Sequence, residues 1–187
     1  MEQIVKADYV QAVVAIKQAI QVSRYRVSRH ANGESLGLYY GVGKYISEHS
    51  RNAAWGTGAI EHISNQLQQE MPGLKGFSAE NMRKMRLFYE AWVDVFENCS
   101  AVSNELGIVP ISSDIQPFIF RSTVSNEIAM QDVSCFVSIG FSQHFSIITK
   151  AKDLSARWFY IRKSATEFWG VRRLEQALRD DLYHTLG

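Results

Sequence analysis

Three basic residues stand within four positions of the segment GFSAENMRKMRLFYEAW, which covers residues 76–92: Arg83, Lys84 and Arg86. Lysine and arginine side chains contact nucleic-acid phosphates, and some also reach base edges. At about 100° per residue the three fall on one side of a helix, opposite an apolar set. That set is Met82, Met85, Phe88, Tyr89 and Trp92. The segment therefore predicts a helix with a buried back and an outward basic face, as in a recognition helix, although an ordinary solvated face has the same pattern.

A second basic group lies near the C-terminus. The pattern from Leu154 predicts one helix to about Phe168, a break at Gly170 and a second helix from Val171. The candidate phosphate contacts are Arg162 and Lys163 on the first helix, and Arg172, Arg173 and Arg179 on the second. Arginine also forms salt bridges within helices, so a structural role is the alternative for this group.

Metal, cofactor and nucleophile chemistry find little support. The histidines are scattered, and none pairs with another at i, i+4; they are His30, His49, His62, His144 and His184. Zinc sites and catalytic dyads need closely placed ligands or partners, so we expect no metal, no cofactor and no catalysis by this chain. The same reasoning makes His144 a capping or core histidine.

Composition predicts a soluble, cytoplasmic chain. The 187 residues are 46% hydrophobic with a formal net charge of +1, so any attraction to nucleic acid must come from local patches. Cys99 and Cys135 have no close-spaced partner and predict reduced thiols. The N-terminus has no basic and apolar leader pattern, and no segment is apolar over the length of a membrane span.

The N-terminal part predicts helices. A first helix should run from a cap at Asp8 to about Arg29, where Asn32 and Gly33 interrupt the pattern, and a second should cover roughly residues 34–49. Gly33, Gly37 and Gly41 stand four apart, a stripe that predicts close helix packing. A third helix should start near Trp55 and Gly56 and end at Pro72 and Gly73, followed by a helix with Ser78 as its N-cap.

These elements predict a fold with two helix-turn-helix-like units that is either all-α or mainly α with a short strand pair in the middle. The expected organisation is an N-terminal helical unit at 1–96, an acidic, serine-rich linker at 97–134 and a C-terminal helical unit at 135–187. The linker is a candidate dimer-forming element, since a long segment of this kind is uncommon in a compact chain.

The segments LYYGVGKYI, WGTGAIEHISNQLQQEMPGLKGFSAENMRKMRLFYEAW and GFSQHFSIITKAKDLSARWFYIRKSATEFWGVRRLEQAL resemble the N-terminal domain of the YhcG-like proteins, a bacterial family. The resemblance covers about residues 8–92 and 136–185. It implies a helical domain that binds DNA and commonly precedes a nuclease domain of the PD-(D/E)XK type. The family pattern has tryptophan where this chain has Tyr40, and histidine where it has Gln143.

Two functions follow as expectations. In the first, the chain is a DNA-binding module that positions a nuclease domain; the chain itself is not expected to cut DNA, because no Glu-x-Lys or Gln-x-Lys occurs in it. In the second, it is a helical module for protein interaction or homo-oligomerisation that uses its aromatic side chains. Those singled out are Trp92, Trp158, Phe159 and Trp169. Expected partners are therefore DNA, a nuclease domain or partner protein, or a second copy, and no membrane.

Overall fold

The structure is a computed structural model that describes residues 2–51, 55–96, 115, 118 and 130–186. These residues form eight α-helices and no strand, which confirms the mainly α prediction. In chain order the helices are α1 (Glu2–Arg51), α2 (Ala59–Glu70), α3 (Ala79–Phe96), α4 (Met130–Phe136), α5 (Phe141–Lys150), α6 (Leu154–Thr166), α7 (Val171–Arg179) and α8 (Leu182–Leu186). The predicted strand pair, Cys99 and most of the acidic linker lie outside the described residues. None of the described helices is both long and apolar enough to cross a lipid bilayer.

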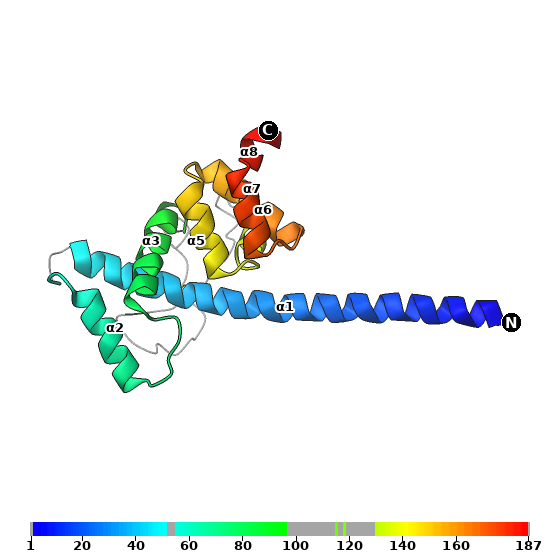
Figure 1. The fold of residues 1–187 in the computed structure, drawn as a ribbon, viewed down its shortest axis with the longest axis horizontal. Coiled ribbons are helices and arrows are strands. Elements are labelled where there is room, and N and C mark those ends of the chain that lie inside the picture. Colours follow the sequence, from blue (N-terminus) through cyan, green and yellow to red (C-terminus); the bar gives the residue numbers. More distant parts are fainter. Residues whose placement is uncertain (1, 52–54, 97–114, 116–117, 119–129, 187) are drawn as a thin grey trace.

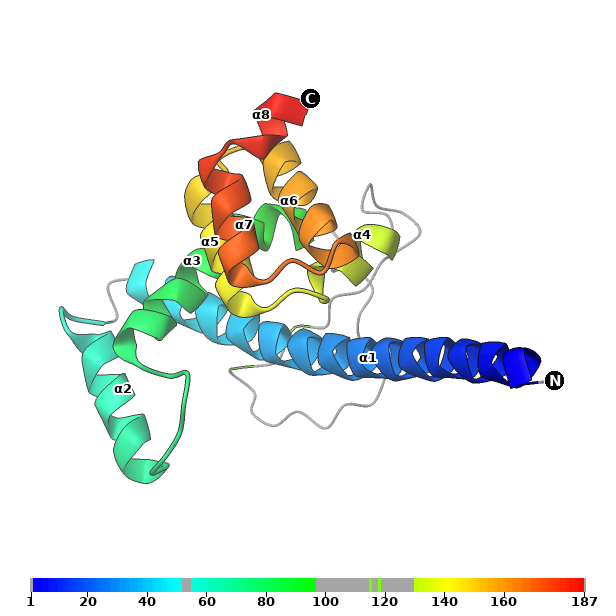
Figure 2. The ribbon, with the colours of Figure 1, turned by 45° about the vertical axis from the view of Figure 1, so that its right-hand side comes forward.

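Helix α1 is the longest element, with 50 residues. Figure 1 shows that its N-terminal half projects beyond every other helix, while α3 crosses its C-terminal half. Helices α4–α8 gather on one side of α1, and Figure 2 keeps this arrangement in a second view. The helical body therefore sits at one end of a long rod.

The predicted break at Asn32 and Gly33 is wrong, because α1 passes through both residues without interruption. Contacts distant in sequence explain this. The Asn32 side chain donates a hydrogen bond to the Ser138 carbonyl at 3.2 Å, and a Cβ at position 33 would lie 3.7 Å from the Val137 Cβ. Glycine inside a helix costs about 1 kcal/mol relative to alanine. Contacts with residues 137 and 138, which follow α4, offset that cost. The local helical pattern contains no information about these distant contacts.

Close packing on α1 involves Gly37 of the predicted stripe and Gly43 outside it. A Cβ at Gly43 would overlap the Met85 carbonyl oxygen of α3, and one at Gly37 would overlap the Phe118 carbonyl oxygen. The Phe118 N–H also donates to the Gly37 carbonyl at 3.0 Å. Gly43, which lies outside the predicted stripe, therefore sets the approach of α1 to α3.

Helix α3 has the predicted faces and the predicted cap. Its buried residues include the whole apolar set of Met82, Met85, Phe88, Tyr89 and Trp92, with Phe96 in addition. At its start the Ser78 Oγ accepts a hydrogen bond from the Asn81 N–H at 3.3 Å. This bond satisfies one of the donors that every helix N-terminus leaves unpaired.

An aromatic core joins the N-terminal and C-terminal helices. Trp92 packs edge-to-face on Phe136 and Trp158, with ring centroids 5.0 and 5.4 Å apart. Trp92, Trp158 and Trp169 are all buried, at 9% exposure or less. The hypothesis that these tryptophans form an interaction surface is therefore wrong: all three pack inward, where large aromatic side chains bury much apolar area. Phe159 is partly buried against the same core.

Candidate nucleic-acid interface

The basic face of α3 carries matching acids. Arg83 pairs with Glu61 of α2, Lys84 lies 2.5 Å from Glu80, and Arg86 lies 3.8 Å from Glu90. The three cations do face away from the core, as predicted, with side chains 29–44% exposed. Since each charge has a carboxylate beside it, this face presents little net positive potential to a phosphate backbone.

The two predicted phosphate contacts on α6 are also paired with carboxylates. Arg162 binds both oxygens of Asp132 in α4, at 2.6 and 2.9 Å, and these hydrogen bonds raise the pKa of the guanidinium. Lys163 lies 2.7 Å from Glu167 one turn later and holds the pKa of that carboxyl below its usual range. The first pair joins two helices, so Arg162 has a clear structural task.

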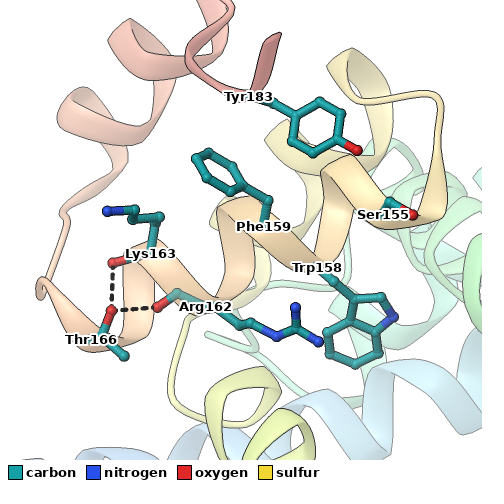
Figure 3. A pocket seen from close by; sticks show the side chains of 7 residues that line it. All are labelled: Ser155, Trp158, Phe159, Arg162, Lys163, Thr166 and Tyr183. Carbon is teal, nitrogen blue, oxygen red and sulfur yellow. Dashed lines mark hydrogen bonds between the residues drawn. The ribbon is translucent and has the colours of Figure 1, made fainter. Parts of the chain in front are cut away.

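Arg162 and Lys163 nevertheless share a shallow hollow of about 530 Å³ on the outer side of α6. Figure 3 shows it, with Phe159 and Tyr183 above the two basic side chains. The full lining is Ser155, Trp158, Phe159, Arg162, Lys163, Thr166 and Tyr183. Aromatic rings beside basic groups suit a planar anionic ligand, although Asp132 and Glu167 already neutralise the two charges.

Helix α7 differs from the other two. Arg172, Arg173 and Arg179 are exposed, and within the described residues none of them forms an ion pair. Arg173 stacks over the Trp169 ring at 5.1 Å, and Arg179 donates to the Gln176 side-chain oxygen at 2.8 Å. Arg173 also lies near enough to Glu167 to help lower the pKa of that carboxyl. The helix therefore presents three guanidinium groups whose charge has no direct carboxylate partner.

Position along the helix adds to this. Arg172 and Arg173 are the second and third residues of α7, and no side chain caps its N-terminus at Gly170. The helix dipole places partial positive charge at that end, so each cation there is disfavoured by roughly 0.3–1 kcal/mol. Two arginines at an uncapped N-terminus concentrate positive potential where phosphates bind most readily.

The turn before α7 contains an aromatic residue that sequence reasoning missed. The sequence predicts a helix to about Phe168, but α6 ends at Thr166. Phe168 has a left-handed φ of 55°, and 75% of its surface is exposed. Its ring contacts Tyr25 of α1 edge-to-face, with centroids 5.7 Å apart. A strained, exposed aromatic a few residues before Arg172 and Arg173 in the sequence is a candidate for stacking on a base. Its place in the sequence, two residues before a helix-breaking glycine, was the available signal.

The two positions that depart from the family pattern have structural places. Tyr40 is buried in the aromatic core, with its ring 5.0 Å from Tyr89. The Gln143 side chain accepts from the Gly140 N–H at 3.1 Å and donates to the Trp169 carbonyl at 2.8 Å. Gln143 therefore ties the start of α5 to the turn that precedes α7.

His144 is the core histidine that was predicted. It is fully buried among Phe88, Trp92 and Phe136, and its Nε2 lies 2.9 Å from the Phe136 carbonyl oxygen. Burial lowers its pKa to about 4. The ring is therefore neutral at pH 7 and stabilises the core rather than serving as a surface base.

Comparison with known proteins identifies the family. The sequence profile of the DUF1016 N-terminal domain matches residues 15–185, which is nearly the whole chain. The chain belongs to this family. A relative from Escherichia coli (strain K12), named "Putative nuclease YhcG", is 27% identical over 184 residues, which are 95% of this chain and 46% of the relative. This DUF1016 N-terminal domain thus spans about half the length of that curated protein. No solved structure gives a significant match.

Proposed function

We propose that this DUF1016 N-terminal domain is a DNA-binding module and that α7 is the helix that contacts the DNA. The observation that carries the proposal is the contrast in pairing: the predicted cations of α3 and α6 each have a carboxylate partner, while Arg172, Arg173 and Arg179 do not within the described residues. A guanidinium group that has no acidic partner is free to neutralise a DNA phosphate and to release the counterions condensed on the DNA, whereas a group in an ion pair must first leave its carboxylate.

The arrangement of α6 and α7 supports this choice. The two helices are joined by the short turn at residues 167–170, and the apolar side of α7 is anchored by Leu174 and Ala177, both buried. A helix anchored on one face and basic on the other, after a short turn, is the arrangement that helix-turn-helix proteins place in the major groove. Phe168 stands at the turn, where it is placed to stack on an unpaired base.

The relative supports the biological setting. Its name describes a nuclease, and this chain matches 46% of its length. A module that holds DNA beside a catalytic part would raise the local concentration of substrate for that part. The proposal therefore gives this chain the positioning role and assigns it no cutting chemistry.

The test is fluorescence anisotropy with a labelled ~30 bp duplex and its single strand, repeated across salt concentrations. The α7 variant carries Arg172→Ala, Arg173→Ala and Arg179→Ala, and the matched control carries Arg83→Ala, Lys84→Ala and Arg86→Ala. We expect the α7 variant to lose about 10–100-fold in affinity and to flatten the log-affinity against log-salt slope by about one per arginine, while the α3 control changes by less than about threefold.

Two results would contradict the proposal. Absence of binding to either strand at low salt would remove the DNA-binding role altogether. Equal losses in the α7 variant and the α3 control would show that carboxylate pairing does not decide which helix contacts DNA. Far-ultraviolet circular dichroism of each variant checks that the helical fold is kept.

A further inference from the structure

A row of large apolar side chains lies exposed along the projecting half of α1. The row, called here the α1 stripe, is Tyr9, Val13, Ile16, Ile20 and Val27, each 47–68% exposed. Isolated apolar residues on a surface are ordinary, but a contiguous row on a long helix marks an interaction site. This feature lies away from α7 and has no part in the proposed DNA contacts (Figure 1).

The spacing of the stripe is that of a coiled coil. Its steps along the chain are four, three, four and seven residues, so its members occupy the a and d positions of successive heptads. At about 100° per residue all five fall within an arc of roughly 60°. Val13, Ile20 and Val27 stand at a positions, where β-branched side chains favour two strands in a parallel coiled coil.

The stripe faces away from the helical body. Tyr25 and Arg29 hold α1 to the body by hydrogen bonds to Ser138 at 2.7 Å and to Ser134 at 2.9 Å. In the same helical projection these two residues lie roughly 150–170° from the centre of the stripe. A partner helix on the stripe would therefore meet α1 on the side opposite to the body.

We propose that the α1 stripe pairs with the α1 stripe of a second copy of this chain, as a parallel, in-register, two-stranded coiled coil. Each apolar layer then meets its own equivalent, Ile16 against Ile16 and Ile20 against Ile20, so all five members are covered at once. Ser23 occupies the d position between Ile20 and Val27, so in this register the two Ser23 side chains meet each other in one small polar layer.

Charge is what selects the second copy and the parallel direction. Residues 9–33 contain no acidic residue, so basic side chains flank the stripe. In a parallel pair each flanking g position faces the e position five residues later on the partner helix. The resulting pairs set every flanking cation against an alanine: Ala12 with Lys17, Ala19 with Arg24, and Arg26 with Ala31. No two like charges meet.

The antiparallel alternative is worse on the same grounds. The antiparallel register that covers all five members of the stripe sets Ile16 against Ile20 and brings Lys17 beside Lys17 of the other chain. Like charges at such flanking positions are destabilising and are used to reject wrong pairings. Two copies in parallel also bring both helical bodies to the same end of the coiled coil, so that the two α7 helices of the dimer lie at that end.

The first test measures the mass of the 187-residue chain by light scattering over a hundredfold range of concentration. We expect twice the chain mass of 21.3 kDa at high concentration, and a return to the single-chain mass in the variant Ile16→Glu with Ile20→Glu. The matched control is Val14→Glu with Val22→Glu, which changes two exposed apolar residues of α1 outside the stripe and should leave the dimer intact. All four side chains lie on the surface, so the fold is expected to survive in both variants.

A cysteine cross-link tests the direction. Val13→Cys in a Cys99→Ser background should form an intermolecular disulfide on oxidation, because the parallel register sets position 13 of one copy against position 13 of the other. The second native cysteine, Cys135, is buried and should not compete. In the antiparallel register, the two copies of residue 13 lie far apart and no cross-link forms. The effect of salt separates this dimer from binding of an acidic partner. Higher salt should leave the apolar self-association unchanged or strengthen it, whereas it should weaken the binding of an acidic partner to the basic side chains.

Three outcomes would overturn the proposal. The first is a chain that stays monomeric at every concentration, which would leave the stripe to a partner of different sequence. The second is a dimer that persists when Ile16 and Ile20 are both glutamate, which would place the interface elsewhere. The third is the absence of the cross-link at position 13 in a chain that does dimerise.

Discussion

Arg162 and Asp132 form a bidentate ion pair that joins α6 to α4, with Nε 2.6 Å from Oδ1 and Nη2 2.9 Å from Oδ2. The two ends of the pair differ in exposure: the Asp132 side chain is 12% exposed and that of Arg162 is 54% exposed. A surface cation that the sequence offers as a phosphate contact is thus committed to a carboxylate 30 residues away.

This asymmetry predicts unequal costs for the two single substitutions. Arg162→Ala leaves a nearly buried carboxylate without its donor and should lower the free energy of unfolding by about 2–3 kcal/mol. Asp132→Ala leaves a guanidinium that water can solvate, and should cost about 1 kcal/mol. Urea unfolding of both variants and of the double variant measures this, and equal costs would contradict it. We also expect Arg162→Ala to leave DNA affinity nearly unchanged.

The contact between α1 and α3 predicts a strong effect at one glycine. Gly43→Ala places a methyl group against the Met85 carbonyl, and neither helix backbone can yield without moving the core. We expect a loss of about 1–3 kcal/mol in unfolding free energy. Gly56→Ala is the control, because a Cβ there meets nothing within 4 Å, and it should change stability by less than about 0.5 kcal/mol. Thermal unfolding of both variants tests this prediction. Equal melting temperatures would show that α1 and α3 are less tightly packed at Gly43 than the structure indicates.

His144 predicts a pH dependence of stability. Its pKa is lowered to about 4 in the folded chain from 6.5 in the unfolded chain, so the unfolded chain takes up the proton more readily. The stability contributed by the neutral ring is therefore complete above about pH 6.5 and is lost as the pH falls toward 4, a change of about 3 kcal/mol.

His144→Gln separates this effect from the titration of carboxylates. The variant cannot titrate at this position, so its unfolding free energy should fall less than that of the native chain between pH 7 and pH 4. Urea unfolding at both pH values gives the two differences. Identical differences would mean that the His144 ring is accessible to protons in the folded state.

Cys135 predicts an inert thiol. The residue is 6% exposed, and burial raises its pKa, with a smaller effect from Asp132 in the same direction. Only the thiolate reacts with disulfide reagents, so Cys135 should react slowly in the folded chain and rapidly in urea. Absorbance with such a reagent, in a Cys99→Ser background, measures the rate, and rapid labelling under native conditions would contradict the buried position.

Local pattern was enough to predict several elements. The apolar spacing from Met82 to Trp92, the cap at Ser78 and the break at Gly170 all come from neighbours within a turn or two, and all three are present in the structure. Signals of this range depend on backbone geometry and helix termini, which a short segment carries with it. The family resemblance was likewise carried by short motifs, and the profile match confirms it.

Local pattern failed where distant residues decide. Asn32 and Gly33 continue a helix because residues 137 and 138 dock against them, more than 100 positions later. Three tryptophans that the sequence offers as parts of an interaction surface are buried, because helices from both halves of the chain pack over them. Side-chain burial is a property of the assembled core, and no window of sequence contains it.

The sequence by itself determined the mainly α class, the faces of α3 and α7, and the positions of the basic residues, since these depend on local helical periodicity. Only the tertiary structure decided which basic residues have partners. Glu61 reaches Arg83 across 22 positions, and Asp132 reaches Arg162 across 30, while Arg172, Arg173 and Arg179 form no direct ion pair with the described residues. Coulomb energy depends on distance in space, and the fold alone sets that distance.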